Sequence, residues 1–143
     1  MEQERKTYKI GVHPPTLRPK STSIGYGNPR YNSMIVYKSG VLLSSGSHLR
    51  LANIKENKID FDRQIGCCQL FQIQENKKYI YVVNYDGLIT LLHKDSLEMA
   101  HQFYAPGKEI RHSSFTDKYL ACSCELVNDS EDGLLLVYRL EDL

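Results

Sequence analysis

From residue 34 onward, apolar runs no longer than one strand alternate with short polar segments. This pattern favours β-strands joined by tight turns. No segment keeps apolar residues at helical spacing for three turns, and the best helix candidate, residues 96–104, is short and lacks a following glycine. We therefore expect an all-β fold for residues 34–143.

Three segments of this part of the chain can be aligned with one another. Each begins with an apolar strand, continues through a polar turn into a second strand, and reaches a third strand after a glycine turn. The expected first strands end at Tyr37, Phe71 and Phe115, the second strands are 41–44, 79–83 and 119–124, and the third strands are 49–52, 88–92 and 134–138. A polar turn then closes each unit, which gives units at 34–66, 67–109 and 110–143.

Glycine turns mark this repeat. They contain Gly46, Asp86-Gly87 and Asp132-Gly133, with the glycines 41 and then 46 residues apart. Asp-Gly suits a tight hairpin turn because that turn needs positive φ, so Asp86 is assigned to turn chemistry. A period of about 40–45 residues is the length of a four-stranded propeller blade. Small sheets of this kind bury both faces only by stacking on their neighbours.

The second and third units resemble the blades of WD-repeat β-propellers. The segments that carry the resemblance are ENKKYIYVVNYDGLITLLHKDSLE and FTDKYLACSCE followed by DGLLLVYRLEDL. No Gly-His pair precedes a blade, and Leu92-His93 and Tyr138-Arg139 stand where the family has Trp-Asp. The buried hydrogen-bond network of the family is therefore assigned to no residue here. The resemblance covers residues 34–143 and implies an incomplete WD-like propeller of about three blades with an irregular N-terminal arm.

A second resemblance concerns the segment that leads into the first unit. It is similar to the lead-in of the echinoderm-microtubule-associated-protein-like group and of related ciliary WD-repeat proteins. The matching residues are Gly25, Tyr26, Arg30, Asn32, Gly40, Ser45 and Gly46. This resemblance implies a scaffold of the cytoskeleton or cilium, with tubulin or axonemal proteins as partners.

Three blades are too few to close a propeller ring, since rings use at least about four. Open sheets would leave apolar faces and unpaired edges in water. Three explanations stay open: further blades in a longer product, blades completed by another chain, or a compact barrel or sandwich. In the first two, residues 134–138 form an edge strand that pairs with, or stacks beside, the missing blades.

Residues 1–33 have a different composition and are expected to form an extended arm. They contain four of the chain's five prolines and six of its 18 lysine and arginine residues. The net charge of the whole chain is nevertheless only +1. Basic and aromatic side chains in one segment favour an anionic partner. The residues expected to bind a partner are Arg18, Lys20, Tyr26, Arg30 and Tyr31. An acidic protein surface such as that of tubulin is one candidate, and nucleic acid is the alternative.

Composition distinguishes among globular, membrane and secreted proteins. Hydrophobic residues make up 41% and charged residues 24% of the 143 residues, as in an ordinary globular domain. No apolar run approaches the ~20 residues of a membrane helix, and the charged N-terminus has no signal-peptide pattern. We therefore expect a cytoplasmic protein that does not bind membranes, with all four cysteines as free thiols.

Candidate chemistry is sparse. The pairs Cys67-Cys68 and Cys122-x-Cys124 lack the spacing of a zinc knuckle, so both are expected to be small buried thiols. The five histidines are scattered, and His48 or His112 is expected to bond a neighbouring strand. The serines within residues 112–117 do not lie in a nucleophile-elbow motif. The glycines within residues 25–27 do not lie in a phosphate-binding loop. Neither a cofactor nor catalysis is predicted.

The resulting hypothesis is a non-catalytic WD-repeat scaffold that mediates protein–protein interactions in a larger assembly, associated with cilia or microtubules. One alternative is a subunit of a nucleic-acid-associated complex that uses the basic arm. The other is a free-standing small β binding domain.

Overall fold

The computed structural model describes residues 24–25, 27, 33–106, 109–125 and 133–143. Within these residues the chain forms eleven β-strands and one short 3₁₀ turn, Leu140–Asp142. No described helix is long and apolar enough to cross a membrane. The strands are β1 (Met34–Tyr37), β2 (Gly40–Ser45), β3 (His48–Asn53), β4 (Lys58–Gln64), β5 (Leu70–Glu75), β6 (Tyr79–Asn84), β7 (Leu88–His93), β8 (Met99–Tyr104), β9 (Ile110–Phe115), β10 (Tyr119–Glu125) and β11 (Gly133–Arg139).

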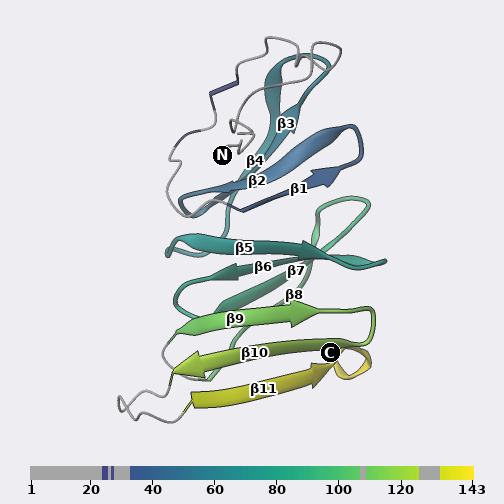
Figure 1. The fold of residues 1–143 in the computed structure, drawn as a ribbon. Helices are drawn as coiled ribbons and strands as arrows, with labels where there is room; N and C mark the ends of the chain where they lie inside the picture. Colours follow the sequence, from purple (N-terminus) through teal and green to yellow (C-terminus); the bar gives the residue numbers. More distant parts are fainter. Residues whose placement is uncertain (1–23, 26, 28–32, 107–108, 126–132) are drawn as a thin grey trace, which may run out of the picture.

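The strands form three antiparallel sheets that follow one another along the chain (Figure 1). We call them blade 1 (β1–β4), blade 2 (β5–β8) and blade 3 (β9–β11). In every blade each strand pairs with the next strand in sequence, so each blade is a simple meander. The sheets are stacked with blade 2 in the middle and β11 at one end (Figure 1). The all-β prediction is confirmed, whereas most of the expected N-terminal arm lies outside the described residues.

The prediction of three strands per unit is wrong for blades 1 and 2, which each have a fourth strand. In β4 (KIDFDRQ), exposed and half-buried residues alternate, and in β8 (MAHQFY) no residue is fully buried. Neither strand has a long apolar run, because only one of its faces touches the core. The helix candidate, residues 96–104, is in fact a turn followed by β8. Likewise β5 extends from Leu70 to Glu75 and does not stop at Phe71.

The hairpin turns use positive φ angles where the sequence has glycine. Gly46 has φ 61° between β2 and β3, and Gly87 has φ 94° between β6 and β7. The Asp86 carboxylate accepts a hydrogen bond from the Leu88 N–H at 3.4 Å within that second turn. Gly133 is the first residue of β11 and lies opposite Glu125 of β10. Asp132 lies outside the described residues.

The core consists of two apolar layers, one on each side of blade 2. The layer between blades 1 and 2 contains Tyr37, Leu42, Leu49, Ile65, Leu70, Ile73, Ile80, Val82, Leu92 and Leu97. The layer between blades 2 and 3 contains Tyr81, Val83, Ile89, Leu91, Ala105, Ile110, Phe115, Leu120, Cys122 and Cys124. Blade 2 is therefore covered on both faces. Each layer is an interface between two blades.

Hydrogen bonds between neighbouring blades fix their position relative to each other. Three of them join residues that are 40 positions apart, in agreement with the repeat. The Ile73 N–H donates to Ser33 Oγ at 3.1 Å, the Asn76 side-chain amide donates to the Thr116 carbonyl at 3.0 Å, and the Lys77 N–H donates to Asp117 Oδ1 at 2.9 Å.

Asn84 fixes the linker between blades 1 and 2. Its side chain is fully buried, and its Nδ2 donates to the carbonyls of Ile65 at 2.8 Å and Cys68 at 2.6 Å. Between these acceptors Gly66 has φ 69°, and a Cβ at this position would lie 2.8 Å from Leu88 Cδ2. The linker thus depends on one buried amide and on a glycine that allows close approach.

Replacing Asn84 by alanine is expected to lower the free energy of unfolding by about 1–3 kcal/mol, because two buried carbonyls lose their donor. Urea unfolding monitored by circular dichroism measures this change. The matched control is Asn53→Ala, whose hydrogen bonds to Asp60 and Glu56 are exposed, with an expected loss below about 1 kcal/mol. Equal losses in the two variants would contradict the role assigned to Asn84.

Candidate interaction surface

Strand register shows which residues of the three blades are equivalent. Residues directly opposite in an antiparallel pair point to the same face of the sheet. We call the face of each blade that points toward the next blade in sequence its leading face. Pairs at its centre are Leu42–Leu51 in blade 1, Tyr81–Leu91 in blade 2 and Ala121–Val137 in blade 3. A second row holds Ser44–Leu49, Val83–Ile89 and Ser123–Leu135.

The leading faces of blades 1 and 2 are buried, whereas that of blade 3 is open. Tyr81, Val83, Ile89 and Leu91 of blade 2 all have an exposed fraction of 0%. Blade 3 covers them, and the Tyr81 ring stacks on Phe115 with centroids 5.3 Å apart.

On blade 3 the equivalent face remains accessible among the described residues. Leu135 is 70% exposed, Val137 58% and Tyr119 47%. The apolar surface made by Tyr119, Ala121, Leu135 and Val137 is therefore a further copy of an interface that the chain already forms twice.

The outer edge of blade 3 is also open. Among the described residues β11 pairs only with β10, whereas the equivalent strands β3 and β7 lie between two neighbours. β11 lies at the end of the stack in Figure 1. The edge position expected for residues 134–138 is therefore confirmed, and their pairing with another blade stays a prediction.

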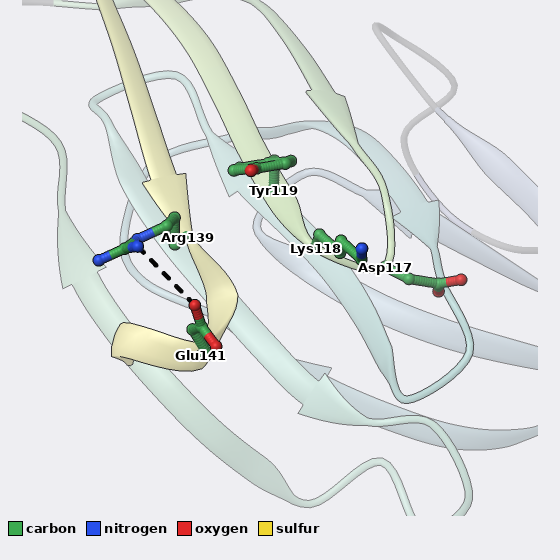
Figure 2. A pocket seen from close by; sticks show the side chains of 5 residues that line it. All are labelled: Asp117, Lys118, Tyr119, Arg139 and Glu141. Carbon is green, nitrogen blue, oxygen red and sulfur yellow. Dashed lines mark ion pairs between the residues drawn. The ribbon is translucent and has the colours of Figure 1, made fainter.

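A pocket of about 300 Å³ lies at one end of this surface. Figure 2 shows its lining residues, Asp117, Lys118, Tyr119, Arg139 and Glu141, around the β9–β10 turn and the end of β11. Arg139 is paired with Glu141 at 3.9 Å and with Asp142 at 2.9 Å. Asp117 accepts the Lys77 N–H. The pocket is a charged site beside the apolar surface, and its Asp117, Arg139 and Glu141 side chains already have partners.

His48 makes the structural bond to a neighbouring strand that the sequence predicts. Its Nδ1 lies 2.7 Å from Asp62 Oδ1 on β4, and Arg50 Nε donates to Asp62 Oδ2 at 3.2 Å. The hydrogen bond from His48, followed by the charge of Arg50, holds the pKa of Asp62 below its ordinary value. A lowered carboxyl pKa stabilises the fold above the unfolded pKa, and this contribution is lost as the pH falls through the folded pKa. Because the pair is solvated, its contribution is small.

The cysteines differ from one another. Cys122 and Cys124 are buried against blade 2, as expected, and burial raises the pKa of Cys122 to about 12. Burial also raises the pKa of Cys124. Both therefore stay protonated and unreactive at neutral pH. The expectation of buried thiols is wrong for Cys67, which is exposed, and for Cys68, which is half-buried, because both lie in the linker between blades 1 and 2. Within the described residues no group of three or more His, Cys, Asp or Glu side chains could hold a metal ion.

The serine, histidine and aspartate residues near β9 do not converge. His112 and Ser114 are exposed on one face of the strand, whereas Ser113 points to the other face and its hydroxyl bonds Gln72. Asp117 lies in the following turn and accepts the Lys77 N–H at 2.9 Å. Ser113 and Asp117 therefore make structural hydrogen bonds, one from the strand and one from the following turn.

The partner-binding residues expected in the arm, Arg18, Lys20, Tyr26, Arg30 and Tyr31, lie outside the described residues. The sequence predicts that residues 134–138 pair with, or stack beside, missing blades, but it does not single out Leu135 and Val137 on the open face. The signal of this face in the sequence is the alignment of Leu135 and Val137 with the buried Ile89 and Leu91.

Comparisons with known proteins are informative for the fold only. No protein-family model matches the chain, and no curated protein matches its sequence. Solved structures do match. The WD40 domain of Neurospora crassa Pan2 is 12% identical with a TM-score of 0.57, and the match covers 73% of this chain and 34% of that chain. The strand arrangement is therefore that of a WD40-like β-propeller segment.

Two further structures share this arrangement. The dihydro-heme d1 dehydrogenase NirN, solved in complex with DHE, is 19% identical with a TM-score of 0.60, over 79% of this chain and 26% of that chain. The computationally designed protein Ika4 is 11% identical with a TM-score of 0.61, over 87% of this chain and 70% of that chain. The chain thus spans about a third of the Pan2 domain and about a quarter of NirN.

Proposed function

We propose that this chain is a non-catalytic, WD-like propeller segment that serves as a scaffold and binds another protein through the leading face of blade 3. One observation carries the proposal. Leu135 and Val137 are exposed on a face whose equivalents in blade 2, Ile89 and Leu91, are fully buried under a neighbouring sheet.

A protein suits this surface better than a small molecule does. The face is a broad sheet surface, and the chain itself shows what covers such a face, namely the apolar side of another sheet. Small ligands favour concave, mostly apolar pockets, whereas four of the five residues that line the pocket beside Tyr119 are charged. Exposed contiguous apolar patches typically mark protein interaction sites.

Replacing the exposed apolar residues tests the proposal. The wild-type chain is expected to self-associate when concentrated, so its mass by light scattering should rise above the monomer mass of 16.5 kDa. The double variant L135T/V137T, which we call the face variant, keeps strand propensity and should stay monomeric with an unchanged circular dichroism spectrum.

Ile54→Thr is the matched control, since Ile54 is also exposed but lies in the turn between β3 and β4. It should self-associate like the wild type. Monomeric wild-type protein at every concentration, or equal self-association of the face variant, would contradict an available apolar face.

We further propose that the partner is tubulin or an axonemal protein, which places the chain in the cytoplasm at microtubules or cilia. This part is supported by the resemblance of residues 25–46 to the microtubule-associated group and by the basic side chains of the arm. The acidic tubulin surface would attract the arm. Nucleic acid is the alternative anion, but a net charge of +1 gives it less support.

Co-sedimentation with microtubules polymerised from purified tubulin tests this assignment. The chain should pellet with microtubules, and the triple variant R18A/K20A/R30A should pellet several-fold less. Binding should also weaken as salt is added. An amount in the pellet that does not depend on microtubules would refute the tubulin assignment and leave the blade 3 face untouched.

A further inference from the structure

β11 has the composition of an inner strand although it lies at an edge. Its sequence is GLLLVYR, with five consecutive apolar residues between Gly133 and Arg139. The outer strand of blade 1, β4, instead carries four charged residues in seven positions. Edge strands of soluble proteins are usually protected by charges or by short length, because open backbone groups pair with other strands. β11 lacks such protection over residues 134–138.

The other two blades show what occupies this edge. In both, an antiparallel fourth strand pairs with the strand that corresponds to β11. Each fourth strand places a phenylalanine on the leading face: Phe61 lies opposite Leu51, and Phe103 lies opposite Ile89. Phe103 then contacts Tyr138 of blade 3, with ring centroids 5.2 Å apart. The remaining positions of β4 are mostly charged or polar, whereas those of β8 include Met99, Ala100 and Tyr104 beside two polar residues.

We infer that the edge of β11 binds an extended segment of a partner protein, which adds to blade 3 as its fourth strand. The segment is antiparallel to β11, six or seven residues long like β8 and β4, with an aromatic residue on the leading side opposite Leu135 or Val137. Backbone hydrogen bonds would supply affinity, and the alternate side chains would supply specificity.

This inference rests on the proposed function, because the same partner would cover the leading face. It adds the chemistry of the contact, a β-strand with an aromatic residue on its leading side. A second copy of β11 fits less well, since β11 has five consecutive apolar residues, whereas β4 and β8 have apolar runs of at most two. Paired β11 strands would leave additional leucines at the outer corner of the blade.

The test uses the wild-type chain, diluted until light scattering gives the monomer mass, and a synthetic peptide with the β4 sequence KIDFDRQ. Amide hydrogen exchange in residues 134–138 is followed by NMR. In a strand, successive N–H groups point to opposite sides, so every second amide of free β11 should exchange fast. Millimolar peptide should slow these amides by roughly tenfold or more. The matched peptide KIDPDRQ cannot form the strand ladder and should have no effect.

Three results would overturn the inference. The first is exchange unaffected by millimolar KIDFDRQ, and the second is equal protection by both peptides. The third is slow amide exchange at the edge of β11 before any peptide is added. In a monomeric chain this result would mean that a segment of the same chain occupies the edge. In a chain that light scattering shows to be a dimer, it would mean that a second copy occupies it. The scaffold proposal is tested by a different measurement, the self-association of the wild type and its loss in the face variant, so failure of that proposal and failure of strand addition are observed separately.

Discussion

The structure depends on one constraint: each blade is a sheet with two apolar faces, and only another sheet can cover them. Blade 2 meets this condition through Leu42 and Leu49 on one side and Phe115 and Leu120 on the other. Its fully buried Tyr81 and Leu91 show the result. The hydrogen bonds between residues 40 positions apart set the relative position of the sheets, but burial of the apolar layers supplies most of the driving force for folding.

The same constraint indicates which end of the molecule is available to a binding partner. A repeat that buries its faces only through neighbours presents, at its open end, a surface shaped for one more neighbour. Among the residues that the structure describes, that end is blade 3, where an apolar face and an unpaired strand edge meet at β11. A partner bound at this end, as proposed above, would make the same kind of sheet-to-sheet contact that holds the blades together.

Much of the fold could be predicted from the sequence because apolar strands and glycine turns give strong local signals. Gly46 and Gly87 fall at turns, and the inner strands β6 and β7 are almost wholly apolar. The fourth strands β4 and β8 could not be predicted, because their place depends on pairing with β3 and β7 and not on their own composition.

The candidate site could be predicted only in part. The edge position of residues 134–138 follows from their place at the end of the last repeat, but the exposure of Leu135 and Val137 depends on the register between β10 and β11. The bond between His48 and Asp62 likewise joins two strands, one of which has no strand signal in the sequence. Tertiary pairing decides such contacts, and local propensity does not encode it.

Native-state hydrogen exchange of the isolated chain, resolved strand by strand, tests the dependence of each blade on its neighbours most directly. The strands β6 and β7, covered on both faces, should exchange only through global unfolding. The strands β10 and β11 should open locally at a lower free energy. Protection of β10 and β11 equal to that of β6 and β7 in the monomeric chain would contradict the claim that blade 3 is an open, incomplete end.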